Sequence, residues 1–192
     1  MSNRAQILVV AATARELATA DGWRTLRCGV GPVEAAAATA AAIAEQRPDA
    51  ILHVGVAGVR RHRALRPGAI VVGSIARYCD LPADLPPQWA SRTVEASPEL
   101  VAAVLRVAPD AVVLPIGTSA RVGGTSGCDV EAMEGFGVLR AAQLAGVPAV
   151  EVRAISNDIE EGDRKHWRLD DAFAAITALT PLLVTEFQQC VS

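Results

Sequence analysis

Short apolar runs rich in β-branched residues alternate along the chain with longer segments in which apolar residues recur at helical spacing. The short runs predict buried strands at residues 7–12, 23–28, 50–56, 69–73, 111–116 and 147–155. The longer segments predict helices at residues 33–46, 98–107, 129–145 and 169–189. Alternating strands and helices favour an α/β domain with a mainly parallel sheet. A proline-rich segment, residues 81–98, is predicted to be an irregular excursion.

Helix-end signals support several of these boundaries. Pro32 suits the first position of the first helix, where its missing N–H costs nothing. Gly146 suits the C-terminal cap of the third helix, and Asp129 is a candidate for that helix's N-cap. On this interpretation Glu131 and Glu134 lie in the first turn of the third helix.

Length and composition describe an ordinary globular chain. The 192 residues suit a single domain over residues 1–192, which would bury roughly two-thirds of its unfolded surface. Hydrophobic residues make up 51% of the chain and aromatic residues only 4%, with alanine abundant, which favours helices packed on a sheet over an all-β fold. The net charge of -3 gives no basic footprint for nucleic acid.

Motifs for cofactors and metals are missing from the sequence. The four cysteines form no CxxC pair and the three histidines are dispersed, so we expect no metal site. The stretch GVGPVE lacks the third glycine of GxGxxG, and neither a P-loop nor a GxSxG elbow is present. We therefore expect no cofactor. The first residues have no signal-peptide pattern, and no apolar run approaches the ~18 residues of a membrane span, so we expect a cytoplasmic protein that does not bind membranes.

Candidate chemistry gathers where the predicted strands end. In parallel α/β sheets ligands bind beyond the carboxyl ends of the strands, and Glu16 follows the first strand closely. Glu134 begins a helix whose N-terminus should face the same region. Either glutamate could instead be a first-turn acid stabilised by the helix dipole.

Two polar residues near the end of the last predicted strand change this balance. Arg153 interrupts an apolar run, where an unpaired charge would be costly, so it requires a carboxylate such as Glu16 or Glu151. The alternative is a purely structural ion pair. Asn157 has an amide that donates and accepts, as the edge of a purine base requires, although an Asx turn would also explain it.

Five stretches, four of them ILVVAATARE, GVGPVEAAAAT, VEAMEG and RAISNDIEEGDRKHW and the fifth residues 53–80, include these residues and carry a resemblance. In order and spacing they resemble the purine nucleoside phosphorylase and nucleosidase superfamily, and within it the futalosine hydrolases. The resemblance implies a single-domain α/β three-layer fold of the phosphorylase/nucleosidase type, in which a central mixed, partly closed β-sheet is flanked by helices.

The resemblance also implies roles for individual residues. Glu16 matches the acid that activates the attacking water, and Arg153 lies where related hydrolases have an arginine near that water. Glu134 matches the glutamate that binds the ribose hydroxyls, with Met133 packing on the sugar. Asn157 matches the group that contacts purine N7, where adenine-cleaving relatives carry aspartate, so asparagine favours a 6-oxopurine base.

The remaining implied contacts belong to two glycine-containing loops. Gly55 marks a close approach of the backbone, and Val56 stands where phosphorylases tend to place a polar residue. The resemblance implies an aromatic residue near residues 121–127 that stacks on the base, but none stands there, which leaves Val122, or a side chain from elsewhere such as Trp167, for that surface. For an aromatic carboxylate on the substrate, the candidates are the arginines of residues 60–63.

The implied activity is hydrolysis of the N-glycosidic bond of futalosine in menaquinone biosynthesis, releasing hypoxanthine and dehypoxanthine futalosine. Two other enzymes remain open, a 5′-methylthioadenosine/S-adenosylhomocysteine nucleosidase and a purine nucleoside phosphorylase. The non-enzymatic alternative is a catalytically silent nucleoside-binding protein. The implied partners are a small-molecule nucleoside and further copies of the chain in a homo-oligomer.

Overall fold

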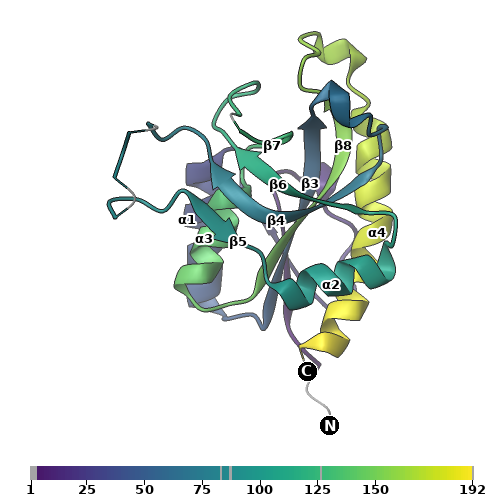
Figure 1. Cartoon of the computed structure of the whole chain (residues 1–192). Helices are drawn as coiled ribbons and strands as arrows, with labels where there is room; N and C mark the ends of the chain where they lie inside the picture. Colours follow the sequence, from purple (N-terminus) through teal and green to yellow (C-terminus); the bar gives the residue numbers. More distant parts are fainter. Residues whose placement is uncertain (1–3, 83, 87, 126, 192) are drawn as a thin grey trace.

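The structure is a computed structural model that describes residues 4–82, 84–86, 88–125 and 127–191 (Figure 1). Its strands are β1 (Ile7–Ala11), β2 (Arg24–Arg27), β3 (Ala50–Val59), β4 (Ile70–Tyr78), β5 (Thr93–Glu95), β6 (Val112–Thr118), β7 (Val130–Ala132) and β8 (Ala149–Asp158). Its helices are α1 (Pro32–Glu45), α2 (Pro98–Val107), α3 (Gly135–Leu144) and α4 (Leu169–Cys190). Three 3₁₀ turns are described as well, η1 (Ala14–Glu16), η2 (Arg61–Arg63) and η3 (Arg164–His166).

The strands form one mixed sheet that closes on itself. Strand β3 pairs in parallel with β1 and β8 and antiparallel with β7. Strand β6 pairs in parallel with β7 and β4, and β4 returns antiparallel to β8. The ring β3-β7-β6-β4-β8 is therefore closed, while β1 and β2 extend the sheet from β3 and β5 extends it from β4. The expectation of a mixed, partly closed sheet is confirmed.

Helices cover the sheet on two sides. Helices α1 and α3 pack against each other on one side, and α2 and α4 on the other (Figure 1). Alternate residues of each buried strand face opposite layers. In β1, Ile7 and Val9 belong to the core with α4, whereas Leu8 and Val10 belong to the core with α1 and α3. A third apolar cluster is formed by residues of the ring strands, among them Ala57, Ile116 and Ile155. The expected three-layer arrangement is confirmed.

The local signals at the helix ends are reproduced with one exception. Helix α1 begins at Pro32, α2 spans the predicted residues, and Gly146 follows α3 in a left-handed conformation. The predicted start of the third helix is wrong. Residues 130–132 form β7, because they pair with β3 on one side and β6 on the other, and α3 begins only at Gly135.

The other departures are small. Strands β3, β4, β6 and β8 continue two to five residues further than the apolar runs predict. In β3 and β8, which run in parallel, the added residues extend the sheet toward the predicted ligand edge. The irregular excursion contains β5, which pairs with β4. Within the described residues, no helix combines the length and the apolar character that crossing a membrane requires.

Candidate active site

A pocket opens at the carboxyl ends of β1, β3 and β8, the edge predicted for a ligand. Six of the predicted site residues line it: Glu16, Val56, Val122, Met133, Glu134 and Asn157. The two others, Gly55 and Arg153, lie beneath it and shape the groups above. Thr13, Ser156, Trp167 and Phe173 also contribute to the wall. Segments far apart in the sequence thus meet in one cavity.

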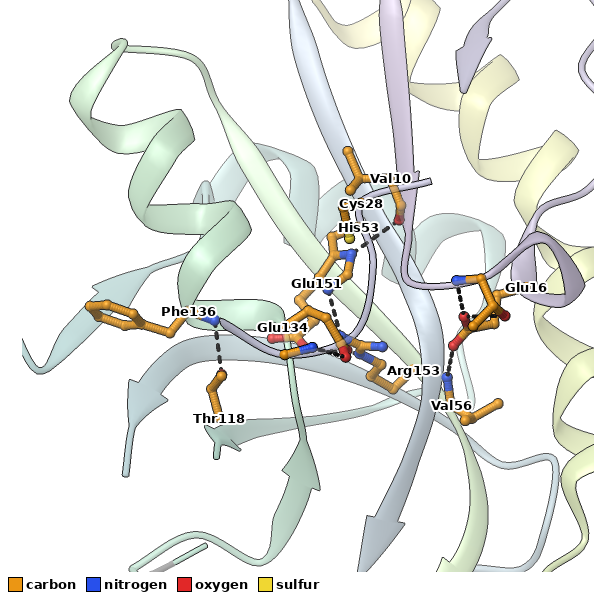
Figure 2. A network of polar contacts seen from close by, with 12 residues as sticks. Val10, Glu16, Cys28, His53, Val56, Thr118, Glu134, Phe136, Glu151 and Arg153 are labelled. Carbon is orange, nitrogen blue, oxygen red and sulfur yellow. Dashed lines mark hydrogen bonds and ion pairs between the residues drawn. The ribbon is translucent and has the colours of Figure 1, made fainter. Parts of the chain in front are cut away.

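Glu16 closes the turn η1 and is almost fully buried at 4% exposure. Its Oε2 accepts hydrogen bonds from the backbone N–H and the hydroxyl of Thr13 at 2.8 and 2.9 Å. Its Oε1 lies 3.3 Å from the backbone nitrogen of Val56, which donates to it (Figure 2). The Thr-x-x-Glu spacing makes this a capping box. The carboxylate is therefore held rigidly at the pocket, with Oε1 the less occupied oxygen.

Glu134 is the N-cap residue of α3 and is 4% exposed. Its Oε1 accepts from the backbone N–H of Gly31 at 3.2 Å, and its Oε2 accepts from Arg153 Nη2 at 3.3 Å. Burial raises the pKa of Glu134, an effect that Arg153 and the Gly31 N–H offset only in part. Neither hydrogen bond is short, so both oxygens keep capacity for hydroxyl donors.

Arg153 organises the acids beneath the pocket and is 1% exposed. Its Nε donates to Glu151 Oε1 at 2.8 Å, while Nη2 lies between Glu134 and His53 (Figure 2). Burial acts to lower the pKa of Arg153, but Glu151, Glu134 and Glu16 together outweigh it and raise that pKa. The expected carboxylate partner is thus Glu151, joined by Glu134, with Glu16 acting through charge at longer range.

The Arg153 guanidinium leaves no room for a side chain at position 55, which explains the glycine there. A Cβ added at Gly55 would lie 2.0 Å from Arg153 Nη1 and 2.8 Å from Glu16 Oε1. The register explains the closeness, because Gly55 is the direct partner of Arg153 in the β3–β8 pair. Gly55 therefore provides the space in which Arg153 and Glu16 approach each other, and any side chain there would separate them.

Asn157 stands at a β-bulge near the end of β8. Its Nδ2 donates to the carbonyl of Asp158 at 2.9 Å, and its Oδ1 accepts from the Ser156 hydroxyl at 2.8 Å. A carbonyl only accepts, so this bond fixes which way the amide points. One N–H of the amide and one lone pair of its oxygen remain for a ligand. The bulge places both Ser156 and Asn157 on the pocket wall, since two successive residues oppose one partner position.

Apolar side chains form the rest of the wall. Val56 and Met133 stand near the two glutamates, and Val122 also lines the pocket, with 42% of its surface exposed. Trp167 and Phe173 come from the segment before α4 and from its first turns. Trp167 is fixed by its indole N–H, which donates to the Glu161 carbonyl. These surfaces suit a sugar and a flat base, and the particular contacts assigned to them remain predictions.

Glu131 has a different position from the expected one. It lies on β7 and not in a helical turn, and its two oxygens accept from the backbone N–H groups of Gly123 and Thr125 at 2.7 and 2.9 Å. The carboxylate thereby holds the loop that carries Val122 against the pocket. Asp129, expected as an N-cap, instead accepts from Arg63 and faces His62. Both differences follow from the strand that replaces the first helical turn.

The arginines of residues 60–63 are already engaged. Arg60 is paired with Glu160, Arg61 with Asp158 and Arg63 with Asp129. Arg60 also donates to the Thr125 carbonyl. These pairs tie the ends of β3 and β8 and the loop before β7 together. They leave little free positive charge for a carboxylate on a substrate.

Sequence reasoning missed the buried His53, and it considered Glu151 only as a possible partner of Arg153. Each is 0% exposed, and each contacts Arg153. Both interrupt apolar strands, the same signal that identified Arg153. Gly135 is tied to this arrangement, because a Cβ there would lie 2.0 Å from Glu151 Oε2. Among the described residues, no group of three or more His, Cys, Asp and Glu side chains is arranged to hold a metal ion.

Comparison with known proteins identifies the family of this chain. A profile described as Phosphorylase superfamily matches residues 24–187. A futalosine hydrolase of Streptomyces coelicolor is 37% identical over 182 residues, covering 82% of this chain and 76% of that protein. A solved structure of a futalosine hydrolase from Helicobacter pylori has a TM-score of 0.83 at 16% identity, covering 95% of this chain and 98% of the other.

A second solved structure has the same fold. It is a 5′-methylthioadenosine/S-adenosylhomocysteine nucleosidase from Colwellia psychrerythraea in complex with adenine, with a TM-score of 0.83 at 20% identity, covering 96% of each chain. At such identity the two solved structures speak for the fold, whereas the Streptomyces coelicolor protein and the profile speak for the family. The chain belongs to the phosphorylase superfamily and, within it, to the futalosine hydrolases.

Proposed function

We propose that this protein hydrolyses the N-glycosidic bond of futalosine and releases hypoxanthine and dehypoxanthine futalosine. One observation carries the proposal: a single pocket combines two buried carboxylates, Glu16 and Glu134, with the oriented amide of Asn157. The menaquinone pathway, a cytoplasmic location and a homo-oligomeric assembly belong to the same proposal and rest on the likeness to the family.

The chemistry suits this constellation because the bond breaks through an oxocarbenium-like sugar. Such a reaction requires negative charge near the sugar, a positioned water and a stabilised leaving base. Glu134 accepts hydrogen bonds from the ribose hydroxyls and, with Met133, fixes the sugar. Glu16 takes a proton from water as the water oxygen bonds to C1′ and the electron pair of the C1′–N9 bond passes to the base. A positioned general base of this kind contributes about 100- to 10,000-fold.

Asn157 supports a 6-oxopurine as the leaving base. Its free N–H is available to N7 or O6 of the base, and its oxygen can accept from a protonated N7. An aspartate in this position would favour a leaving adenine by delivering a proton to N7. The alternative of phosphorolysis is disfavoured because Val56, an apolar residue, stands where the phosphorylases tend to place a polar one.

The test is a chromatographic assay of futalosine, inosine and 5′-methylthioadenosine, each with and without inorganic phosphate. We expect hypoxanthine from futalosine at equal rates in both conditions. If the free base formed only with phosphate, together with a ribose 1-phosphate product, the reaction would be phosphorolysis and not hydrolysis. Adenine release from 5′-methylthioadenosine at comparable efficiency would make the chain an adenine nucleosidase. Tight binding of futalosine without turnover of any of the three would indicate a silent binding protein.

The water-activating role has its own variant. Glu16→Gln retains the shape of the side chain and removes the base, so we expect kcat to fall by about 100-fold or more while futalosine binding stays nearly unchanged. The matched control is Glu45→Gln, the same change at an exposed position on α1. Unchanged turnover in Glu16→Gln would refute the role of Glu16 as base.

A further inference from the structure

His53 has a fully buried imidazole, and the hydrolysis described above assigns it no role. It lies on β3 with 0% exposure, and both of its ring nitrogens have partners. Nδ1 is 3.0 Å from the carbonyl oxygen of Val10 on β1, and Nε2 is 2.5 Å from Arg153 Nη2 (Figure 2). The ring therefore bridges the backbone of one strand and the guanidinium of another.

The chemistry of these partners fixes the protonation state of the ring. A backbone carbonyl only accepts hydrogen bonds, so Nδ1 must carry the hydrogen. A guanidinium only donates, so Nε2 must present its lone pair. His53 is thus neutral and in the Nδ1–H tautomer. Burial, and then the charge of Arg153, lower the pKa of His53 well below its usual value, which agrees with this assignment.

The same Nη2 group connects His53 to the pocket. Its two hydrogens go to His53 Nε2 and to Glu134 Oε2, and the neighbouring Nε donates to Glu151. Fixing three donors of a planar group in this way leaves the guanidinium no rotational freedom. A chain of contacts consequently runs from Val10 through His53 and Arg153 to the carboxylate of Glu134.

We propose that His53 is a positioning residue that holds the Arg153 guanidinium in the one orientation in which it supports Glu134 for binding the sugar hydroxyls. The proposal rests on the proposed function, since it assumes that Glu134 contacts the sugar. His53 itself touches neither the substrate nor the water. Its effect is on the geometry of Glu134 and hence on KM more than on kcat, because Glu16 is held independently by Thr13 and Val56.

Two substitutions separate the two halves of the bridge. In His53→Gln the amide oxygen can replace Nε2 as the acceptor for Arg153, but the bond to Val10 is lost. In His53→Asn the amide nitrogen can replace Nδ1 as the donor to Val10, but the side chain is too short to reach Arg153. We expect kcat/KM for futalosine to fall by about 10- to 100-fold in His53→Asn, chiefly through KM, the size of a lost hydrogen bond to a charged group. In His53→Gln we expect it to stay within about threefold of the wild type.

A purely structural His53, needed only to anchor β3 to β1, predicts the opposite order. Equal losses in the two variants, or a larger loss in His53→Gln, would therefore overturn the proposal. His62→Gln makes the same chemical change at an exposed histidine of η2 and serves as the matched control. Melting temperatures of all variants show whether a loss of activity reflects a loss of folded protein.

A measurement without substrate tests the bridge independently of the activity. In the wild-type protein labelled with ¹⁵N-histidine, the ring of His53 should show a protonated Nδ1 and an unprotonated, hydrogen-bonded Nε2, assigned by the signal missing from His53→Gln. A protonated Nε2 would overturn the proposal even if His53→Asn were inactive. An inert wild type with the expected Nδ1–H tautomer would refute the proposed function while leaving the His53–Arg153 bond established.

Discussion

Two groups of arginines near the pocket differ in their surroundings. Arg153 is buried beneath the pocket, where one guanidinium meets the carboxylates of Glu151 and Glu134 and the ring of His53. Arg61 and Arg63 lie at the rim, each paired with an acid while its side chain remains largely exposed at 66% and 43%. In both regions an arginine pairs with carboxylates, but only the rim pairs are exposed to solvent.

The difference lies in solvent. At the rim, water screens the charges, and each pair contributes between zero and about 1 kcal/mol. Beneath the pocket, water cannot replace a missing partner, so every polar group depends on the others. We therefore expect small displacements to disturb Glu134 and its neighbours more than they disturb the pairs at the rim. The predictions below test this contrast, in order from the largest to the smallest expected effect.

Removing the buried charge should have the largest effect. Arg153→Met fills a similar volume but leaves Glu151 and Glu134 buried without their cation. We expect the free energy of unfolding to fall by about 3–5 kcal/mol, and futalosine hydrolysis to be lost. Urea denaturation and the chromatographic assay measure the two effects. A stable and active Arg153→Met protein would show that the buried acids are satisfied by other means.

Displacing the same guanidinium without removing it should cost less. Gly55→Ala places a methyl group 2.0 Å from Arg153 Nη1, so the side chain must move away from Glu16. We expect a loss of about 1–3 kcal/mol in the free energy of unfolding, typical of overpacking, together with reduced turnover. The control is Gly162→Ala, where nothing lies within 4 Å of the added methyl group. Equal stability of the two variants would mean that Arg153 relaxes freely.

Stability should also depend on pH through the buried histidine. The pKa of His53 is lowered in the folded protein, so below about pH 6.5 the unfolded chain binds a proton there that the folded chain does not. The free energy of unfolding should then fall as pH falls, by up to about 1.4 kcal/mol per pH unit from this residue. Denaturation curves of the wild type and His53→Gln between about pH 5 and pH 7 isolate the effect. A constant difference between the two proteins across that range would contradict it.

The smallest effects belong to the rim. Arg61→Met removes the pair with Asp158 at a site where the arginine side chain is 66% exposed. We expect a change within about 1 kcal/mol in the free energy of unfolding, and one that shrinks as salt is added. A loss as large as that in Arg153→Met would erase the contrast between the two regions.

The local sequence pattern predicted those helices and strands whose ends are marked by residues typical of such ends. Helix α2 was predicted at its observed bounds, and in the structure its start carries local signals, with Pro98 at the first position and the Ser97 side chain accepting from the Leu100 N–H. Strands β5 and β7 were missed because each has only three residues and forms by pairing with other strands, β5 with β4 and β7 with β3 and β6. Such pairing overrides the helical appearance of a short acidic segment.

The residues of the candidate site likewise divide into those with a local sequence signal and those whose contacts depend on the assembled sheet. Arg153 was identified because a charge in an apolar strand demands a partner, and Glu151 was among the partners considered. His53 offers the same signal, but its contact with Arg153 spans 100 positions of the chain. That contact depends on the register of β3 with β8, in which His53 faces Glu151 and Gly55 faces Arg153. Register is a property of the assembled sheet, and no local pattern contains it.

The closed ring of strands has a consequence for how the protein reaches its folded state. Strand β8 must enter between β3 and β4, and its pairing with β3 joins Ile51 to Ala149, partners far apart in the sequence. Contacts of such long range make folding slow, on the order of milliseconds to seconds. Because Arg153 and Asn157 arrive with this strand, the nucleoside pocket should be among the last features to form. A nucleoside would therefore bind only to molecules in which the ring of strands has closed. By binding, it would stabilise the fully folded protein.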